Sequence, residues 1–139
     1  PEGAEDPGLR RLGPAGLERV VALTMAAFGD TPAEARRMAE TTFSDPARQC
    51  WGLWEGEDLT AAACVGPAGE GLSLYGVAVD PARQGQGLGR RLMAALLAVL
   101  PRDKTLVVEV DGGNRPARAL YEGFGFRERR RQDYFVLDR

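Results

Sequence analysis

The stretch from Val77 to Arg91 reads Val-Ala-Val-Asp-Pro-Ala-Arg-Gln-Gly-Gln-Gly-Leu-Gly-Arg-Arg. It begins as an apolar strand that ends at Asp80-Pro81, and it continues as a glycine-rich turn that leads directly into a helical pattern from Leu88. Glycines let a backbone come close to a bulky ligand, and the first N–H groups of a helix lack partners and carry the positive end of its dipole. The stretch therefore predicts an anion-binding loop, with a phosphate or pyrophosphate as its natural ligand.

The spacing of the glycines restricts which phosphate ligand fits. A dinucleotide fingerprint needs a third glycine three positions after its second, but Arg90 stands three positions after Gly87. No Lys-Ser or Lys-Thr pair follows the turn, so the nucleotide P-loop pattern is absent as well. A nucleotide-binding α/β module is therefore disfavoured, and a glycine-rich loop without a ligand stays an alternative. The turn itself reads Gln84-x-x-Gly87-x-Gly89.

A second pattern lies downstream of the turn. The chain reads Leu-Val-Val-Glu-Val-Asp from Leu106 to Asp111, and Asn-Arg-Pro-Ala-Arg-Ala-Leu-Tyr-Glu-Gly-Phe-Gly-Phe from Asn114 to Phe126. Together the two patterns resemble the GNAT family of N-acetyltransferases, in which the glycine turn holds the acetyl-CoA pyrophosphate and a later motif reads Asn-x-x-Ala-x-x-Leu-Tyr-x-x-x-Gly-Phe. The resemblance covers residues 74–126. Within the family, this half is most similar to the ribosomal-protein alanine N-acetyltransferases.

Hydrophobic periodicity and turn residues predict an α/β fold with a mixed sheet, in the order β-α-α-β-β-β-α-β-α-β-β. Strands are expected at 9–12, 50–55, 59–65, 72–79 and 104–110, with a final pair from 126 onward, and helices at 14–28, from Thr31-Pro32 to near Ser44, at 88–100 and at 115–123. A break is expected at Gly66-Pro67-Ala68-Gly69. The strand–helix–strand unit makes 72–79 and 104–110 parallel neighbours. We expect one domain over residues 1–139, with residues 1–8 frayed.

Composition narrows the chemistry. The chain has 139 residues, of which 44% are hydrophobic and 27% charged, and its formal net charge is −2. These values are typical of a globular domain and give no reason to expect nucleic acid or a membrane as a partner. There is no histidine and there are two cysteines, Cys50 and Cys64, so we expect no metal site and no imidazole base. The absence of a signal segment at residues 1–7 predicts a cytoplasmic protein with free thiols.

The resemblance gives the parallel strands a specific role. In GNAT enzymes they splay apart, and the pantetheine arm bonds to main-chain groups of the first strand, which correspond to Val77, Ala78 and Val79. Core packing of these side chains is compatible with that role. The residues expected at the pyrophosphate are Gln84, Gly85, Gln86, Gly87, Leu88, Gly89 and Arg90. Asn114 is expected to reach the pantetheine, to cap the helix that follows, or both.

Acetyl transfer to an amine needs a base and an acid. Tyr121 occupies the position at which many family members place a tyrosine near the cofactor sulfur, so it is expected to be the acid, with plain packing as the alternative. Glu109 interrupts an apolar strand, and a poorly solvated carboxylate there would have the raised pKa of a base. The resembling ribosomal-protein enzymes carry a glutamate twelve positions before the tyrosine, as here. A solvated face shared with Asp111 is the alternative for Glu109.

The resemblance implies an N-acetyltransferase that moves acetyl from acetyl-CoA to a primary amine by direct transfer in a ternary complex. The alternatives are a non-catalytic acyl-CoA-binding or regulatory domain, and a protein N-terminal alanine acetyltransferase. The two N-terminal helices lack the tryptophan-containing segment of that last subgroup, and the tail after Phe126 is short. A small amine, an amino acid, an antibiotic amine, a peptide N-terminus or a lysine therefore all stay open as acceptors. Analogy with the family also suggests a homodimer.

Overall fold

The computed structural model describes residues 3–110, 114–129 and 134–138. Within them, seven strands form one mixed sheet in the order β1-β2-β3-β4-β5-β7-β6. The strands are β1 (Leu9–Leu12), β2 (Gln49–Glu55), β3 (Asp58–Ala68), β4 (Gly71–Val79), β5 (Leu106–Glu109), β6 (Arg127–Arg129) and β7 (Tyr134–Leu137). The helices are α1 (Leu17–Phe28), α2 (Pro32–Ser44), α3 (Leu88–Val99) and α4 (Arg115–Gly123), with 3-10 turns at Pro14–Gly16 and Pro81–Arg83. This element order is the predicted one.

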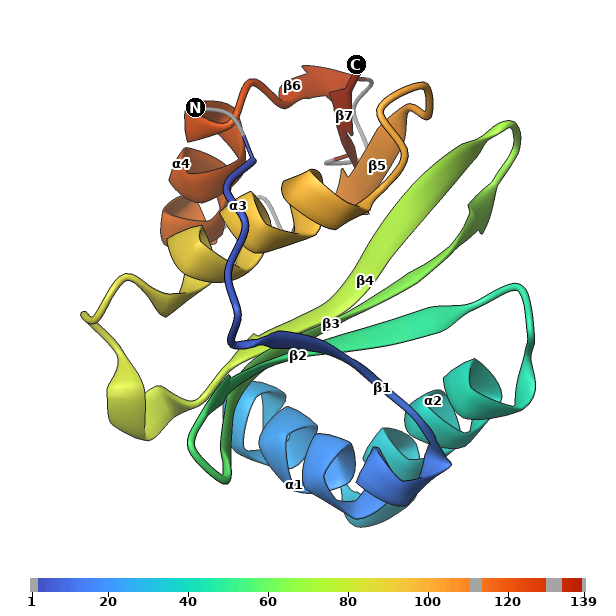
Figure 1. The fold of residues 1–139 in the computed structure, drawn as a ribbon, viewed down its shortest axis with the longest axis vertical. Helices are drawn as coiled ribbons and strands as arrows, with labels where there is room; N and C mark the ends of the chain where they lie inside the picture. Colours follow the sequence, from blue (N-terminus) through green and yellow to red (C-terminus); the bar gives the residue numbers. More distant parts are fainter. Residues whose placement is uncertain (1–2, 111–113, 130–133, 139) are drawn as a thin grey trace.

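The helices cover both faces of the sheet (Figure 1), with α1 and α2 on one face and α3 and α4 on the other. Local signals set their ends. α1 stops at Gly29, which takes the left-handed conformation at φ 71° and donates its N–H to Met25 O. α2 starts with a capping box, in which Thr31 and Glu34 each accept the other's backbone N–H. The predicted end of α1 and the predicted start of α2 are therefore confirmed by their caps, whereas Pro14–Gly16, expected to begin the first helix, forms a 3-10 turn before it.

One predicted boundary is wrong. The stretch from Gly66 to Ala68, expected to be a break, continues β3 and pairs with β4 as far as Ala68↔Gly71. The strand tolerates Pro67 because β2 pairs with β3 only up to Val65, so that no ladder bond is lost at the missing N–H. The turn comes at Gly69, where φ is 58°.

The two cysteines face each other across neighbouring strands. Cys50 of β2 is the register partner of Cys64 of β3, and both thiols are free and only 2% exposed. Among the described residues before β1, Ala4 and Asp6 have partners on α3. Ala4 N donates to Ala94 O of α3 at 2.9 Å, and Asp6 forms an ion pair with Arg91 at 3.0 Å. Among the described helices, none is both long and apolar enough to cross a membrane.

The parallel pair β4–β5 splays apart, as predicted. The two strands pair at three positions, the last of which is Leu74↔Val108. Beyond it β5 continues along β7, whereas β4 passes through a bulge at Gly76, where φ is 57° and a Cβ would stand 3.1 Å from Met38 Sδ. Only glycine combines that conformation with so close a neighbour. The divergence opens the sheet at its centre, next to α4.

Candidate functional site

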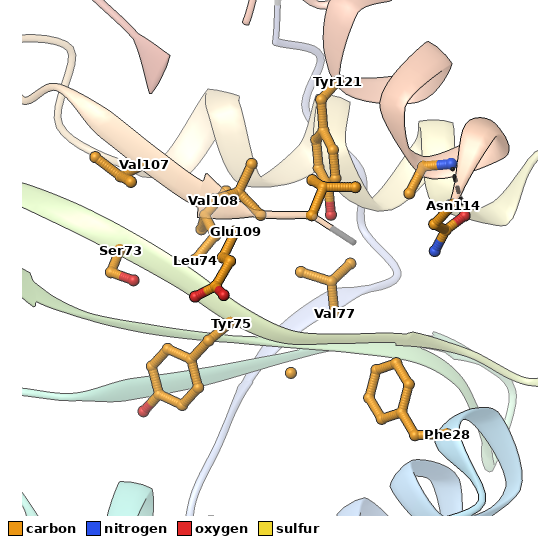
Figure 2. Close-up of a pocket in the computed structure, with 13 residues that line it drawn as sticks. Phe28, Ser73, Leu74, Tyr75, Val77, Val107, Val108, Glu109, Asn114 and Tyr121 are labelled. Carbon is orange, nitrogen blue, oxygen red and sulfur yellow. Dashed lines mark hydrogen bonds between the residues drawn. The ribbon is translucent and has the colours of Figure 1, made fainter. Parts of the chain in front are cut away.

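The opening between β4 and β5 is a pocket of about 930 Å³ (Figure 2). Its walls come from β4, β5, α4 and the last residue of α1. Four of the residues predicted for function line it together: Val77, Glu109, Asn114 and Tyr121. Side chains far apart in the sequence are thus gathered where the parallel strands separate. Clefts at the carboxyl ends of diverging strands are common ligand sites in α/β proteins.

Tyr121 is held by α4 and lines the pocket although it is only 4% exposed. Its ring packs edge-to-face against Phe126, with ring centroids 5.4 Å apart. Burial raises the pKa of the phenol to about 12, so the hydroxyl keeps its proton at neutral pH. Figure 2 shows this hydroxyl pointing into the space between the strands. The residue therefore has the protonation state and the orientation of a proton donor.

Glu109 is the last residue of β5, and its carboxylate points into the same space (Figure 2). The side chain is exposed, so the poor solvation expected from the apolar strand is not observed. Glu109 therefore both lines the pocket and contacts solvent. The alternative that paired it with Asp111 involves a residue outside the described part of the chain. An exposed carboxylate at a pocket mouth can still accept a proton, directly or through water.

Asn114 is the N-cap of α4. Its Oδ1 accepts a hydrogen bond from Ala117 N at 3.2 Å, so the capping role expected of it is observed (Figure 2). The side chain also lines the pocket. Since the oxygen is used by the cap, the amide NH₂ is the group left to donate to a ligand. The two roles suggested by the sequence are therefore compatible.

The backbone of β4 beyond Leu74 supplies hydrogen-bonding groups to the opening. Ala78 and Val79 pair with β3, and Ala78 is buried, so these residues do pack in the core. The backbone N–H and C=O groups of successive residues in a strand point alternately toward its two neighbouring strands. Beyond Leu74, β5 no longer pairs with β4, so the groups of β4 that point toward β5 have no strand partner there. Val77, which lines the pocket, stands on this unpaired stretch. Core packing and an open backbone edge thus coexist on the same strand.

The predicted anion-binding loop precedes α3. Gly85 and Gly87 have φ of 82° and 73°, conformations that suit glycine, and Gly87 is the N-cap. The first bond of this helix runs from Arg91 N to Gly87 O at 3.0 Å. The N–H groups of Leu88, Gly89 and Arg90 therefore precede the helical ladder, and among the described residues no side chain caps this end. These groups are suited to binding an anion.

The side chains around the loop differ in their exposure to solvent. Gln84, Gln86 and Arg90 are exposed, whereas Leu88 is buried and anchors the helix. Gly89 has a packing role of its own, because a Cβ there would stand 3.3 Å from Leu120 Cδ2. Its lack of a side chain lets α3 and α4 approach each other, where the sequence suggested only space for a ligand.

Sequence reasoning missed part of the lining. Phe28, Ser73, Tyr75 and Gly76 all contribute to the pocket, and none was singled out. An isolated glycine inside a strand is a signal for a bulge, so Gly76 was detectable. Phe28 carried no such signal, because it reads as the last apolar residue of a helix before Gly29. Its role depends on how α1 is placed against β4.

Comparison with known proteins identifies the family to which the sequence and the fold are similar. The sequence model of the acetyltransferase (GNAT) family matches residues 17–126. A mycothiol acetyltransferase from Kineococcus radiotolerans is 43% identical over 116 residues, covering 76% of this chain and 37% of the relative. The ribosomal protein bS18 alanine N-acetyltransferase of Escherichia coli K12 is 47% identical over 58 residues, covering 40% of this chain and 39% of the relative.

Solved structures agree with the sequence matches. The crystal structure of the ribosomal-protein alanine N-acetyltransferase from Escherichia coli superposes with a TM-score of 0.78 at 27% identity, over 92% of this chain and 89% of that one. The chain spans between 37% and 45% of the length of the first three curated relatives.

Proposed function

Because the chain belongs to the acetyltransferase (GNAT) family, whose members use acetyl-CoA, we propose that it transfers an acetyl group from acetyl-CoA directly to a primary amine. The observation that carries this proposal is the pocket between β4 and β5, where the Tyr121 hydroxyl and the Glu109 carboxylate meet the unpaired edge of β4. A non-catalytic acyl-CoA-binding domain would need the open edge but neither of these two groups.

Acetyl-CoA is proposed to bind along the line from the opening to the start of α3. The free N–H groups of Leu88, Gly89 and Arg90 hold the pyrophosphate, and the exposed Arg90 side chain adds a charge. The backbone groups of Val77 and Val79 on the side of β4 that β5 has left bond the pantetheine amides in place of a strand, and the Asn114 NH₂ group assists. This arrangement directs the thioester to the pocket lined by Tyr121.

In the proposed reaction Glu109 removes a proton from the incoming ammonium, directly or through a water molecule. The neutral amine attacks the thioester carbon and forms a C–N bond, and an N–H of β4 stabilises the oxyanion that develops. When the C–S bond breaks, Tyr121 donates its proton to the departing CoA sulfur. The nitrogen loses its second proton as the amide forms, and this proton restores the Tyr121 hydroxyl through solvent. The products are an N-acetyl amine, CoA and the proton that Glu109 releases to solvent.

The two curated relatives do not identify the acceptor of this chain, because their names give different molecules. The names of these relatives point to mycothiol and to an alanine of ribosomal protein bS18 as candidates, and the longer of the two sequence matches is to the mycothiol enzyme. The homodimer and the cytoplasmic location suggested by the sequence stay predictions.

The test is thiol release from acetyl-CoA over a panel of amino acids, aminoglycosides, polyamines and peptides with free N-termini, together with a melting scan with CoA. We expect CoA to raise the melting temperature and one class of amine to release thiol. Stabilisation without turnover on the whole panel would favour the non-catalytic acyl-CoA-binding domain, and no stabilisation by CoA would contradict the proposal entirely.

A further inference from the structure

The pocket has two different ends. Tyr121 and Asn114 lie on the side of β4 that faces α3 and α4, whereas Phe28 and Tyr75 lie on the side of α1 and α2 (Figure 2). The proposed phosphate-binding loop starts α3, so the cofactor arrives from the α3 side. The Phe28 end is therefore left for the acceptor amine. Assigning this end to the acceptor rests on the proposed acetyltransferase function.

The acceptor end has an aromatic wall. Phe28 is 51% exposed, and its ring rises from the end of α1 toward β4 (Figure 2). Tyr75 is fixed from two directions, because its hydroxyl bonds with Thr42 Oγ1 at 2.7 Å and the Arg48 guanidinium lies 5.4 Å from its ring centroid. The half-exposed ring of Phe28, beside the fixed ring of Tyr75, is suited to covering an apolar part of a ligand.

The same end has one charge. Among the described residues that line the pocket, Glu109 alone carries a charged side chain. Arg48, whose guanidinium lies against the Tyr75 ring, is not part of the lining and pairs with Asp45 at 3.1 Å. An ammonium group would therefore find a carboxylate here. A carboxylate beside the reacting nitrogen would find no cation among the described lining residues, and would face Glu109 instead.

We propose that the acceptor is a primary amine on an apolar or aromatic body with no carboxylate beside the reacting nitrogen, and that free amino acids are rejected. A substrate of this class is an amide- or peptide-linked α-amine or an arylalkylamine. Phe28 contacts the apolar body and sets its affinity, and Glu109 receives the ammonium. The aromatic wall selects for an apolar body, and Glu109, the one charged side chain among the described lining residues, selects against a zwitterion.

The test compares phenethylamine, phenylalanine amide and phenylalanine as acceptors, with acetyl-CoA saturating. All three carry the same ring. The amine of phenethylamine is at least as basic as that of phenylalanine, so this pair separates the charge of the carboxylate from the basicity of the nitrogen. We expect kcat/KM for phenethylamine and for the amide to exceed that for phenylalanine by about tenfold or more.

A variant then tests the aromatic wall. Phe28→Ala should raise KM for phenylalanine amide by about tenfold and leave kcat nearly unchanged, with a much smaller effect on glycinamide, which has no ring to lose. Val99→Ala is the matched control, because Val99 is the other large exposed hydrophobic residue among those described, at 45%, and lies at the far end of α3.

The outcomes separate the two proposals. Equal use of phenylalanine and phenethylamine would overturn the charge selection while leaving the acetyltransferase activity established. An unchanged KM for phenylalanine amide in Phe28→Ala would overturn the role of the aromatic wall. Absence of thiol release with all four amines, in a protein that acetylates another amine of the wider panel, would overturn the acceptor class alone. Absence of thiol release over that whole panel, although CoA binds, would overturn the proposed function.

Discussion

Leu120 of α4 and Gly89 of α3 are in contact range, because Leu120 Cδ2 lies 3.3 Å from the point that a Cβ on Gly89 would occupy. The glycine at this position of the turn therefore keeps α3 and α4 close to each other. Together these two helices carry the proposed phosphate-binding groups and Tyr121. Their spacing thus sets the distance between the two ends of the proposed cofactor site.

A methyl group at Gly89 should not give the usual benefit of alanine in a helix. Gly123→Ala in α4 meets open space and should stabilise the protein by about 0.5–1 kcal/mol. Gly89→Ala should give no gain or a loss, because Leu120 must move by a few tenths of an ångström. Urea unfolding of the two variants measures this difference. Equal stabilisation by both would show that the helices have room to spare.

Gly87 tests the conformation of the loop. Its φ of 73° costs an ordinary residue about 1–2 kcal/mol, whereas asparagine takes this conformation more readily. We expect Gly87→Val to weaken acetyl-CoA binding by about tenfold and Gly87→Asn to weaken it less. Isothermal titration of each variant with acetyl-CoA gives the comparison. Arg102→Ala, at an exposed position after α3, serves as the surface control. If Gly87→Val binds acetyl-CoA as tightly as the wild-type protein, the loop does not hold the phosphates.

Tyr121→Phe tests the proposed acid. Phenylalanine preserves the ring packed on Phe126 and removes only the hydroxyl. Turnover should fall by about 100-fold with little change in the KM for acetyl-CoA, since general acid catalysis contributes on that scale. Glu109→Gln should lower turnover as well, but its effect should diminish at high pH, where more of the amine arrives deprotonated. Wild-type turnover in Tyr121→Phe would remove this residue from the mechanism.

The pKa of Tyr121 predicts a stability change at alkaline pH. Burial raises it to about 12, against an ordinary value of 10.0. The folded protein therefore keeps this proton at a pH where the unfolded chain loses it. The contribution of this group to the free energy of unfolding is therefore fully present below pH 10, and it is lost as pH rises from 10 toward 12. Denaturant unfolding between pH 9 and 12 should show a shallower decline for Tyr121→Phe, and identical slopes would contradict the assignment.

The cysteine pair should be inert in the folded state. The hydrogen bond with Cys64 and burial both raise the pKa of the Cys50 thiol, and both side chains are 2% exposed. A thiol reagent needs an accessible thiolate, so the native protein should react slowly and the two thiols should titrate fully only in denaturant. Fast labelling of the native protein would show that β2 and β3 open readily.

Much of the fold was predictable from sequence because its signals are local. Gly29, the Thr31–Glu34 box and Asn114 end or begin helices through their own backbone chemistry. The extension of β3 through Pro67 was not predictable, since it depends on where β2 stops. The same holds for Phe28 and Tyr75. They belong to the pocket through the packing of α1 and α2 on the sheet, which no short pattern encodes.

The three-position pairing of β4 with β5 has a mechanical consequence. This short ladder joins the part of the sheet that carries α1 and α2 to the part that ends in β7 and β6. A cofactor that bonds along the open edge would act as an eighth strand and tie the two parts together. Each catalytic cycle would then alternate between a more cohesive sheet and a looser one, and amide hydrogen exchange at Leu106 to Val108 would record the difference.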